Sequence, residues 1–254
     1  MLKPFDCHCH LDEIEDRDNI IKECKEKLSG LINCGTNKET NKFTLNIIKK
    51  YSFIYGAIGI HPIYFDQLSD EQFNDEIFFI EQNLNKKIVA IGETGLDFSI
   101  IKNKPNFKIL KEKQEKYFIN HINLAKQYDL PLIIHSRWAA SKVLEILIRE
   151  KAKNVVLHCF NASLQDVKKA IDNGYFISIA TNILYNENIK KYIEKFDIDN
   201  FVLETDSPYL FKPINTPLNI WLVVKEISKI KNISEIDIIK ITNKNIKKIF
   251  KINI

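Results

Sequence analysis

Two histidines and two cysteines occupy four consecutive positions near the start of the chain, in the segment DCHCHLD. All four are residue types that bind metals. In a β-strand successive side chains point to opposite faces, so Asp6, His8 and His10 share one face. Cys7 and Cys9 share the other face, and the two pairs cannot hold one ion together. The spacing predicts that the histidines bind a metal and that the thiols pack behind them.

Other hydrophobic runs end in residues of the same chemistry. Four apolar segments finish at or next to an ionisable or metal-binding residue: Glu93, His135, His158 and Asp206. Burial of an unpaired carboxylate costs several kcal/mol, so a cation beside these residues would explain their placement. Four histidines and two carboxylates exceed the needs of one tetrahedral ion. They suit two divalent cations with a bridging carboxylate and water, as in metal-assisted displacement at phosphorus.

The elements that must position these residues alternate along the chain. Short apolar runs predict eight strands, at 5–11, 30–36, 53–62, 88–93, 130–136, 154–160, 175–180 and 201–207. Amphipathic segments predict helices at 18–28, 106–128, 140–151, 163–173, 217–231 and 234–250. Ser163 and Ser234 are the expected caps of two of them. The alternation predicts an α/β fold, a (β/α)8 TIM barrel, with the extra C-terminal helix on its exterior. A doubly wound open sheet is the alternative.

Composition indicates an ordinary folded protein, since 45% of the residues are hydrophobic and 28% are charged. No linker or low-complexity block divides the sequence, so we expect one domain over residues 1–254. No apolar stretch is long enough to cross a bilayer and no signal region precedes Asp6, so we expect a cytoplasmic protein without a membrane partner. No obligate protein partner is evident.

Five cysteines without a CxxC pair favour reduced thiols over a disulfide framework or a zinc knuckle. The net charge of +4 has two interpretations. It fits a polyanionic partner, or merely lysines on solvated helix faces.

Six motifs follow one another along the chain: DCHCHLD, AIGIHP, IGETGLDF, LPLIIHSR, LHCF and LETDSPYL. In this order they resemble the TatD family of metal-dependent deoxyribonucleases, within the amidohydrolase-like barrel superfamily. Weaker similarity continues through NTPLNIWLVVKEIS and ITNKNIKKIF, nearly to the end of the chain. The resemblance implies a barrel hydrolase that cleaves DNA phosphodiester bonds, often as a 3′ to 5′ exonuclease, with Mg²⁺, Mn²⁺ or Zn²⁺.

The resemblance also implies a role for each candidate ligand of two divalent cations. His8 and His10 would hold one cation, with Asp206 in the same shell. His135 and His158 would hold the second.

Glu93 would bridge the two cations. The cations would lower the pKa of a bound water and neutralise charge on the phosphoryl oxygens. Asp206 would orient and deprotonate that water, so Glu93 and Asp206 are the expected catalytic residues. The expected substrate is DNA with single-stranded ends.

Four further residues are expected around the site. Arg137 can fork onto a phosphate and His61 can bond one. A surface-paired arginine and a plain strand-end histidine are the alternatives. Glu204, on the same strand face as Asp206, is either a partner of the metal ligands or a polar filler of the barrel. Asp6 is expected to hold an imidazole in place.

Three segments depart from the family pattern. FKPINTP lacks an Arg-Gly pair that is usual there and has Thr216 in place of a glutamate, so a substrate contact is missing. Ala162 in HCFNAS replaces a glycine, which disfavours a positive φ or a close backbone approach. Trp138 in HSRWA stands where aspartate is common. Its indole could stack on a base, or pack at the start of a helix.

Three functions compete. A deoxyribonuclease is favoured by the motifs. An amidohydrolase-type enzyme acting on an amide, ester or lactone would share fold and metals, but no candidate for a carboxylated lysine is evident, since the fifth strand ends in His135. A catalytically weak nucleic-acid-binding protein would have little reason to keep candidates at all six ligand positions.

Overall fold

Eight parallel strands form one sheet in the order β1 to β8 in the computed structural model, which describes residues 2–254. The strands are β1 Phe5–Cys9, β2 Gly30–Cys34, β3 Ile54–Ile58, β4 Ile88–Asp97, β5 Leu132–Arg137, β6 Val155–Leu157, β7 Phe176–Ile179 and β8 Phe201–Leu203. Beyond the last strand, Asp206 N donates to His8 O at 3.0 Å and His10 N donates to Ser207 O at 2.8 Å. These two bonds bring the ends of the sheet together, so the sheet forms a nearly closed TIM barrel.

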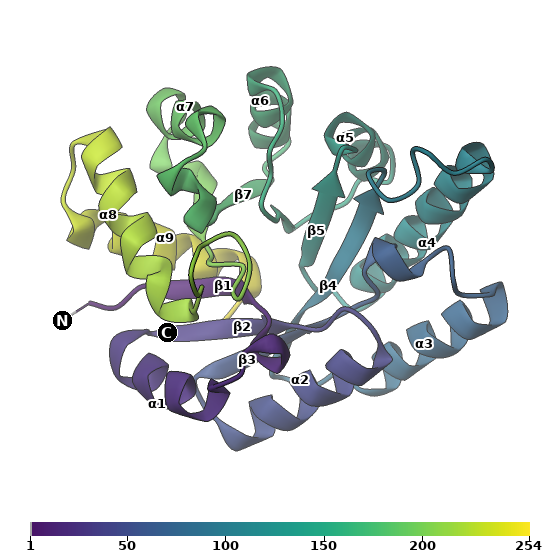
Figure 1. Ribbon diagram of the computed structural model, residues 1–254, viewed down its shortest axis with the longest axis horizontal. Coiled ribbons are helices and arrows are strands. Elements are labelled where there is room, and N and C mark those ends of the chain that lie inside the picture. Colours follow the sequence, from purple (N-terminus) through teal and green to yellow (C-terminus); the bar gives the residue numbers. More distant parts are fainter. Residues whose placement is uncertain (1) are drawn as a thin grey trace.

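The described residues also form nine α-helices, which surround the curled sheet (Figure 1). They are α1 Arg17–Lys27, α2 Lys38–Lys50, α3 Asp70–Gln82, α4 Phe107–Gln127, α5 Ala140–Arg149, α6 Leu164–Asp172, α7 Glu187–Lys195, α8 Ile220–Lys231 and α9 Glu235–Phe250. Ser163 and Ser234 cap α6 and α9 as expected, each accepting from a backbone N–H in the first turn. Asn37 does the same for α2, one of three helices in connections for which no range was predicted.

The extra C-terminal helix α9 closes one end of the barrel. Inside the barrel a buried cluster contains Ile133 and Val156, each two residues before a site histidine and therefore on the same face. Ile249 and Phe250 of α9 belong to this interior cluster. Asn245 of α9 donates to backbone oxygens at the start of β8. The helix exists as predicted, but it covers the N-terminal opening of the barrel instead of lying on its outer wall.

The alternation predicted for β1 is wrong. Cys7 belongs to the interior cluster, whereas Cys9 belongs to the larger cluster between strands and helices. The register between β1 and β2 shifts between Asp6 and Cys9, which indicates a bulge. The bulge lets His8 and His10 face the interior although Cys7 does so too. All five cysteines are free, as expected.

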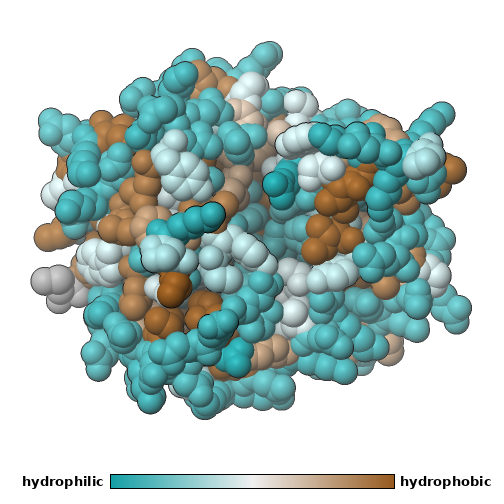
Figure 2. All heavy atoms as spheres, in the orientation of Figure 1, coloured by the Kyte–Doolittle hydropathy of each residue, from teal (hydrophilic) through white to brown (hydrophobic). Residues whose placement is uncertain are grey.

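The surface in the view of Figure 1 is mainly hydrophilic, with hydrophobic side chains in separate groups (Figure 2). On α1 and α6, Lys27 and Lys168 pair with carboxylates one turn away, at 2.8 and 2.7 Å. Such pairs are typical of solvated helix faces and contribute only a few tenths of a kcal/mol each. No helix within residues 2–254 combines the length and apolar character needed to cross a membrane.

Candidate metal centre

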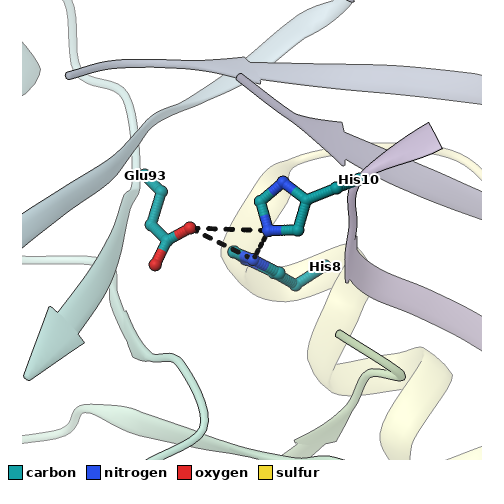
Figure 3. A group of neighbouring side chains, drawn as sticks. All are labelled: His8, His10 and Glu93. Carbon is teal, nitrogen blue, oxygen red and sulfur yellow. Dashed lines mark hydrogen bonds and ion pairs between the residues drawn. The ribbon is translucent and has the colours of Figure 1, made fainter. Parts of the chain in front are cut away.

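The six predicted ligands lie together at the carboxyl ends of the strands. Five of them come from near the end of a strand or from the residues just after it: His8, His10, His135, His158 and Asp206. Glu93 lies in the middle of the longer strand β4. Figure 3 shows His8 and His10 from β1 pointing toward Glu93 on β4. At most 16% of any of the six side chains is exposed. Chain segments almost 200 residues apart thus converge on one buried polar cluster.

His8 and His10 each face two carboxylate oxygens. His8 Nε2 and His10 Nε2 are 3.1 Å apart, and they lie 3.4 and 3.6 Å from Glu93 Oε2. The same two nitrogens lie 3.5 and 3.6 Å from Asp206 Oδ1. A tetrahedral ion with ligands at about 2.0–2.2 Å has ligands separated by about 3.3–3.6 Å. His8, His10 and Glu93 therefore fit as ligands of one divalent cation, and Asp206 Oδ1 lies at a similar distance from both histidines.

The other oxygen of Glu93 faces a second pair of histidines. Glu93 Oε1 lies 2.9 Å from His135 Nδ1 and 3.8 Å from His158 Nε2. His158 Nε2 also lies 3.8 Å from Asp206 Oδ1. Because one oxygen of Glu93 points to each histidine pair, its carboxylate has the orientation of a bridge between two cations.

The second nitrogen of each imidazole determines whether the first can bind a cation. His10 Nδ1 is 3.0 Å from the carbonyl oxygen of Cys34, which can only accept, so Nδ1 carries the proton. His158 Nδ1 is likewise 3.0 Å from Glu204 Oε2. In both residues the Nε2 lone pair is left facing the centre. This arrangement is typical of histidines that ligate metals.

His135 has a carboxylate at each nitrogen. Its Nε2 lies 3.1 Å from Asp97 Oδ2 and its Nδ1 lies 2.9 Å from Glu93 Oε1, so either nitrogen can carry the proton. His8 is the exception, since its buried Nδ1 has no hydrogen-bond partner among residues 2–254. Two of the four candidate imidazoles, His10 and His158, are thus preset as ligands by an acceptor at Nδ1.

His61 lies beside the centre as the opposite tautomer, with its proton directed toward the centre. Its Nδ1 accepts from Ile63 N at 3.1 Å, so the proton is on Nε2, which lies 3.3 Å from Glu93 Oε1. Neutral His61 therefore donates into the centre and has no lone pair to offer a cation there. This geometry suits the substrate contact expected for His61.

Asp97 is a site residue that the sequence did not single out. The predicted fourth strand stopped at Glu93, whereas β4 continues to Asp97 and pairs with β5 along its whole end. Gly95 allows this pairing, because a Cβ there would lie 2.0 Å from the carbonyl oxygen of His135. The available signal was the second carboxylate of the motif IGETGLDF.

Asp6 does not contact an imidazole. Its Oδ1 accepts from the backbone N–H of His8 at 3.2 Å and of Thr205 at 3.0 Å, and its Oδ2 accepts from Thr205 Oγ1 at 2.6 Å. The expectation that it holds a histidine ring is wrong, because the bulge in β1 turns it toward the seam with β8. Burial raises the pKa of Asp6 to about 8.

Glu204 and Arg137 are placed differently. Glu204 contacts His158 Nδ1 and also accepts from Cys159 N at 2.9 Å, which matches the interpretation as a partner of a metal ligand. The Arg137 side chain is exposed, and it forms no hydrogen bond or ion pair with the described residues. A surface ion pair does not therefore account for Arg137.

The charges of the cluster balance one another in a way that favours cations. Burial alone would raise the pKa of Glu93 and Asp206, but neighbouring histidines, foremost His61 and His158 respectively, lower both. Burial alone would lower the pKa of His10, but the neighbouring carboxylates of Asp206 and Glu93 raise it to about 9. The buried carboxylates are thus stable only with positive charge close to them at the centre. Divalent cations supply that charge and displace the protons of the imidazoles.

Comparison with known proteins places this geometry in a family. A family model described as TatD related DNase matches residues 5–251. The chain belongs to the TatD family. It is 31% identical to the metal-dependent hydrolase YabD of Bacillus subtilis, described as uncharacterized, over 98% of this chain and 99% of that one.

Two further TatD relatives agree. The human protein named Deoxyribonuclease TATDN3 is 30% identical over 96% of this chain and 93% of its own. The crystal structure of the TatD homologue YjjV from Escherichia coli superposes with a TM-score of 0.88 at 25% identity, over 99% of both chains. The chain is accordingly a metal-dependent hydrolase of the TatD family, acting on ester bonds.

Proposed function

We propose that this chain is a deoxyribonuclease that uses two divalent cations to hydrolyse phosphodiester bonds at single-stranded DNA ends, in the 3′ to 5′ direction. The observation that carries the proposal is Glu93, with one carboxylate oxygen toward each histidine pair. Two cations bridged in this way are the typical arrangement for in-line displacement at phosphorus. The name of the human relative supports DNA as the substrate.

The residues divide into two sets around Glu93. His8, His10 and Asp206 would hold one cation. His135 and His158 would hold the other. Bound Mg²⁺, Mn²⁺ or Zn²⁺ would lower the pKa of a water molecule and neutralise charge on the phosphoryl oxygens.

The chain's own groups would then orient and move protons. Asp206 Oδ1 lies 3.5 Å from His8 and 3.8 Å from His158, so it faces both cation positions. The lowered pKa of Asp206 keeps it ionised, and it can therefore take a proton from the attacking water. The Nε2–H of His61 and the exposed guanidinium of Arg137 would donate to the phosphate.

The test uses one DNA sequence with the label at either end, single-stranded or annealed. With Mg²⁺, Mn²⁺ or Zn²⁺ added separately, 3′-labelled DNA should release a labelled mononucleotide at once, and 5′-labelled DNA should give a descending ladder. The reverse pattern would contradict the proposed polarity. Absence of cleavage with all three metals would contradict the deoxyribonuclease itself.

The control variant carries His8→Ala and His10→Ala together. It should lose cleavage and should bind one cation fewer per chain, measured by elemental analysis after dialysis. The second readout separates loss of a ligand set from loss of the fold. Equal cleavage by this variant would show that another site, or a contaminating nuclease, does the chemistry.

A further inference from the structure

We propose that Trp138 and Lys102 form a stacking platform for an unpaired nucleobase beside the metal centre. The proposal rests on the deoxyribonuclease function above and adds how the enzyme would select single-stranded ends. Trp138 immediately follows β5 and is three residues from His135. A base held on Trp138 would therefore lie next to the phosphate under attack.

Trp138 does not pack at the start of a helix, which was one of its two interpretations. Its side chain is 63% exposed, and its backbone has a φ of 58°. A bulky residue rarely adopts a positive φ, and such a conformation persists only where surrounding structure holds it. Ala139 N donates to Ser136 O across it, closing a tight turn. The turn projects the indole into solvent at the mouth of the barrel.

Lys102 orients this indole. Its Nζ lies 3.7 Å from the centre of the ring, within the range of a cation–π contact. Lys102 belongs to the loop between β4 and α4, so the loops after two neighbouring strands of the site meet at Trp138. With the ammonium on one side and most of the ring exposed, an apolar surface remains available for stacking.

The charges around Trp138 match a nucleic acid strand. Within residues 2–254, neither Lys102 Nζ nor the Arg137 guanidinium forms an ion pair with a carboxylate, whereas Lys104 of the same loop pairs with Asp66. Lys102 beside the ring and Arg137, next to Trp138 in the sequence, thus have no counter-charge among the described residues. An unpaired nucleotide supplies both a flat base and a phosphate, and aromatic stacking of this kind is typical of single-strand recognition.

Other exposed aromatic residues near the mouth are already engaged through their polar ends. The hydroxyl of Tyr185 donates to Leu210 O at 3.0 Å, and the hydroxyl of Tyr209 bonds to Glu13. The indole N–H of Trp138 donates to no residue among 2–254. Among these exposed aromatic residues, Trp138 is therefore the one whose polar group has no hydrogen-bond partner within residues 2–254.

The experiment measures binding without cleavage. In EDTA, the dissociation constant of a fluorescent oligothymidylate is measured by anisotropy, beside that of an oligomer of equal length and charge whose nucleotides are abasic. Trp138→Asn removes the ring but keeps a residue that tolerates a positive φ. It should weaken oligothymidylate binding about 5- to 100-fold, the range for one lost stacking contact. Binding of the abasic oligomer should not change.

Two variants check the assignment. Trp138→Phe should restore most of the affinity, because it restores a ring. Phe78→Ala removes an equally exposed aromatic residue, 61% exposed on α3, and should leave both dissociation constants unchanged. Equal affinities for wild type and Trp138→Asn, or equal losses on both oligomers, would overturn the platform.

Failure of the platform is distinguishable from failure of the deoxyribonuclease. If wild type degrades DNA but Trp138→Asn binds oligothymidylate normally, only the platform is wrong. If base-dependent binding is lost in Trp138→Asn but wild type degrades no DNA with any metal, the platform stands and the nuclease function is wrong.

Discussion

The two ends of the barrel are built from the same strands for opposite purposes. At the N-terminal end, inward side chains such as Ile133 and Val156 form an apolar cluster closed by α9. Two residues further along the same strands, the inward positions are His135 and His158. At the carboxyl end, therefore, these two strands present inward groups that are polar and need a partner. One end supplies the stability that the buried charge of the other end costs.

Glu93→Gln tests the carboxyl end of the barrel, and we expect it to have the largest effect. The amide has the same shape but cannot bridge two cations, so we expect hydrolysis to fall by a factor of about a thousand or more. Stability of the metal-free protein should fall, because the lowered pKa of Glu93 means that the surrounding histidines stabilise its buried charge. Hydrolysis rates and thermal unfolding in EDTA measure the two effects. Glu145→Gln, on the exposed face of α5, is the matched control.

Phe250→Ala tests the opposite end. The side chain is 3% exposed in the interior cluster, so its truncation should cost about 3–5 kcal/mol of unfolding free energy. Urea unfolding measures the loss. The folded fraction should hydrolyse substrate at the wild-type rate, because the centre lies at the other end. A large loss of turnover in fully folded protein would contradict a division of labour between the ends.

His121 adds a pH dependence from outside the centre. It is buried, its Nε2 accepts from Ile60 N, and burial lowers its pKa from 6.5 to about 4. Between these values the unfolded chain binds more protons, so acidification from pH 6.5 to 4 should remove about 3 kcal/mol of unfolding free energy.

The pH effect of His121 is measured by urea unfolding in EDTA, so that metal binding does not contribute. The stability contribution is fully present above pH 6.5. His121→Gln keeps an acceptor for Ile60 N and a donor for Tyr117 O without titrating, so its stability should vary less over the same range. Equal slopes for the two proteins would assign the pH dependence to other groups.

Asp97→Ala should have the smallest effect of these changes. It tests whether the two cation positions can be weakened separately. Asp97 contacts only the His135 side, so the affinity of the second cation should fall about 10- to 100-fold. The affinity of the first cation, at His8 and His10, should be unchanged. Metal titration followed by calorimetry resolves the two steps. Equal weakening of both steps would show that Asp97 acts on the whole fold.

Most of the fold and the six clustered residues could be predicted because each signal is local. A short apolar run that ends in Glu93 or His158 predicts both a strand and a position of that last residue near the mouth of the barrel. The bulge at Asp6 and the extension of β4 to Asp97 depend on register with neighbouring strands, which no local pattern encodes. The state of His61 depends on a proton fixed by Ile63 N, which only the folded loop provides.

The bond from Asn243 of α9 to Lys3 O joins the last helix to the residues just before β1. Together with the seam between His8 and Asp206, it means that β1 is completed by segments that are synthesised long after it. Contacts of such long sequence separation form late in folding. A chain synthesised only as far as β7 therefore holds His8 and His10 without Asp206, and the site is assembled only once β8 and α9 have been made.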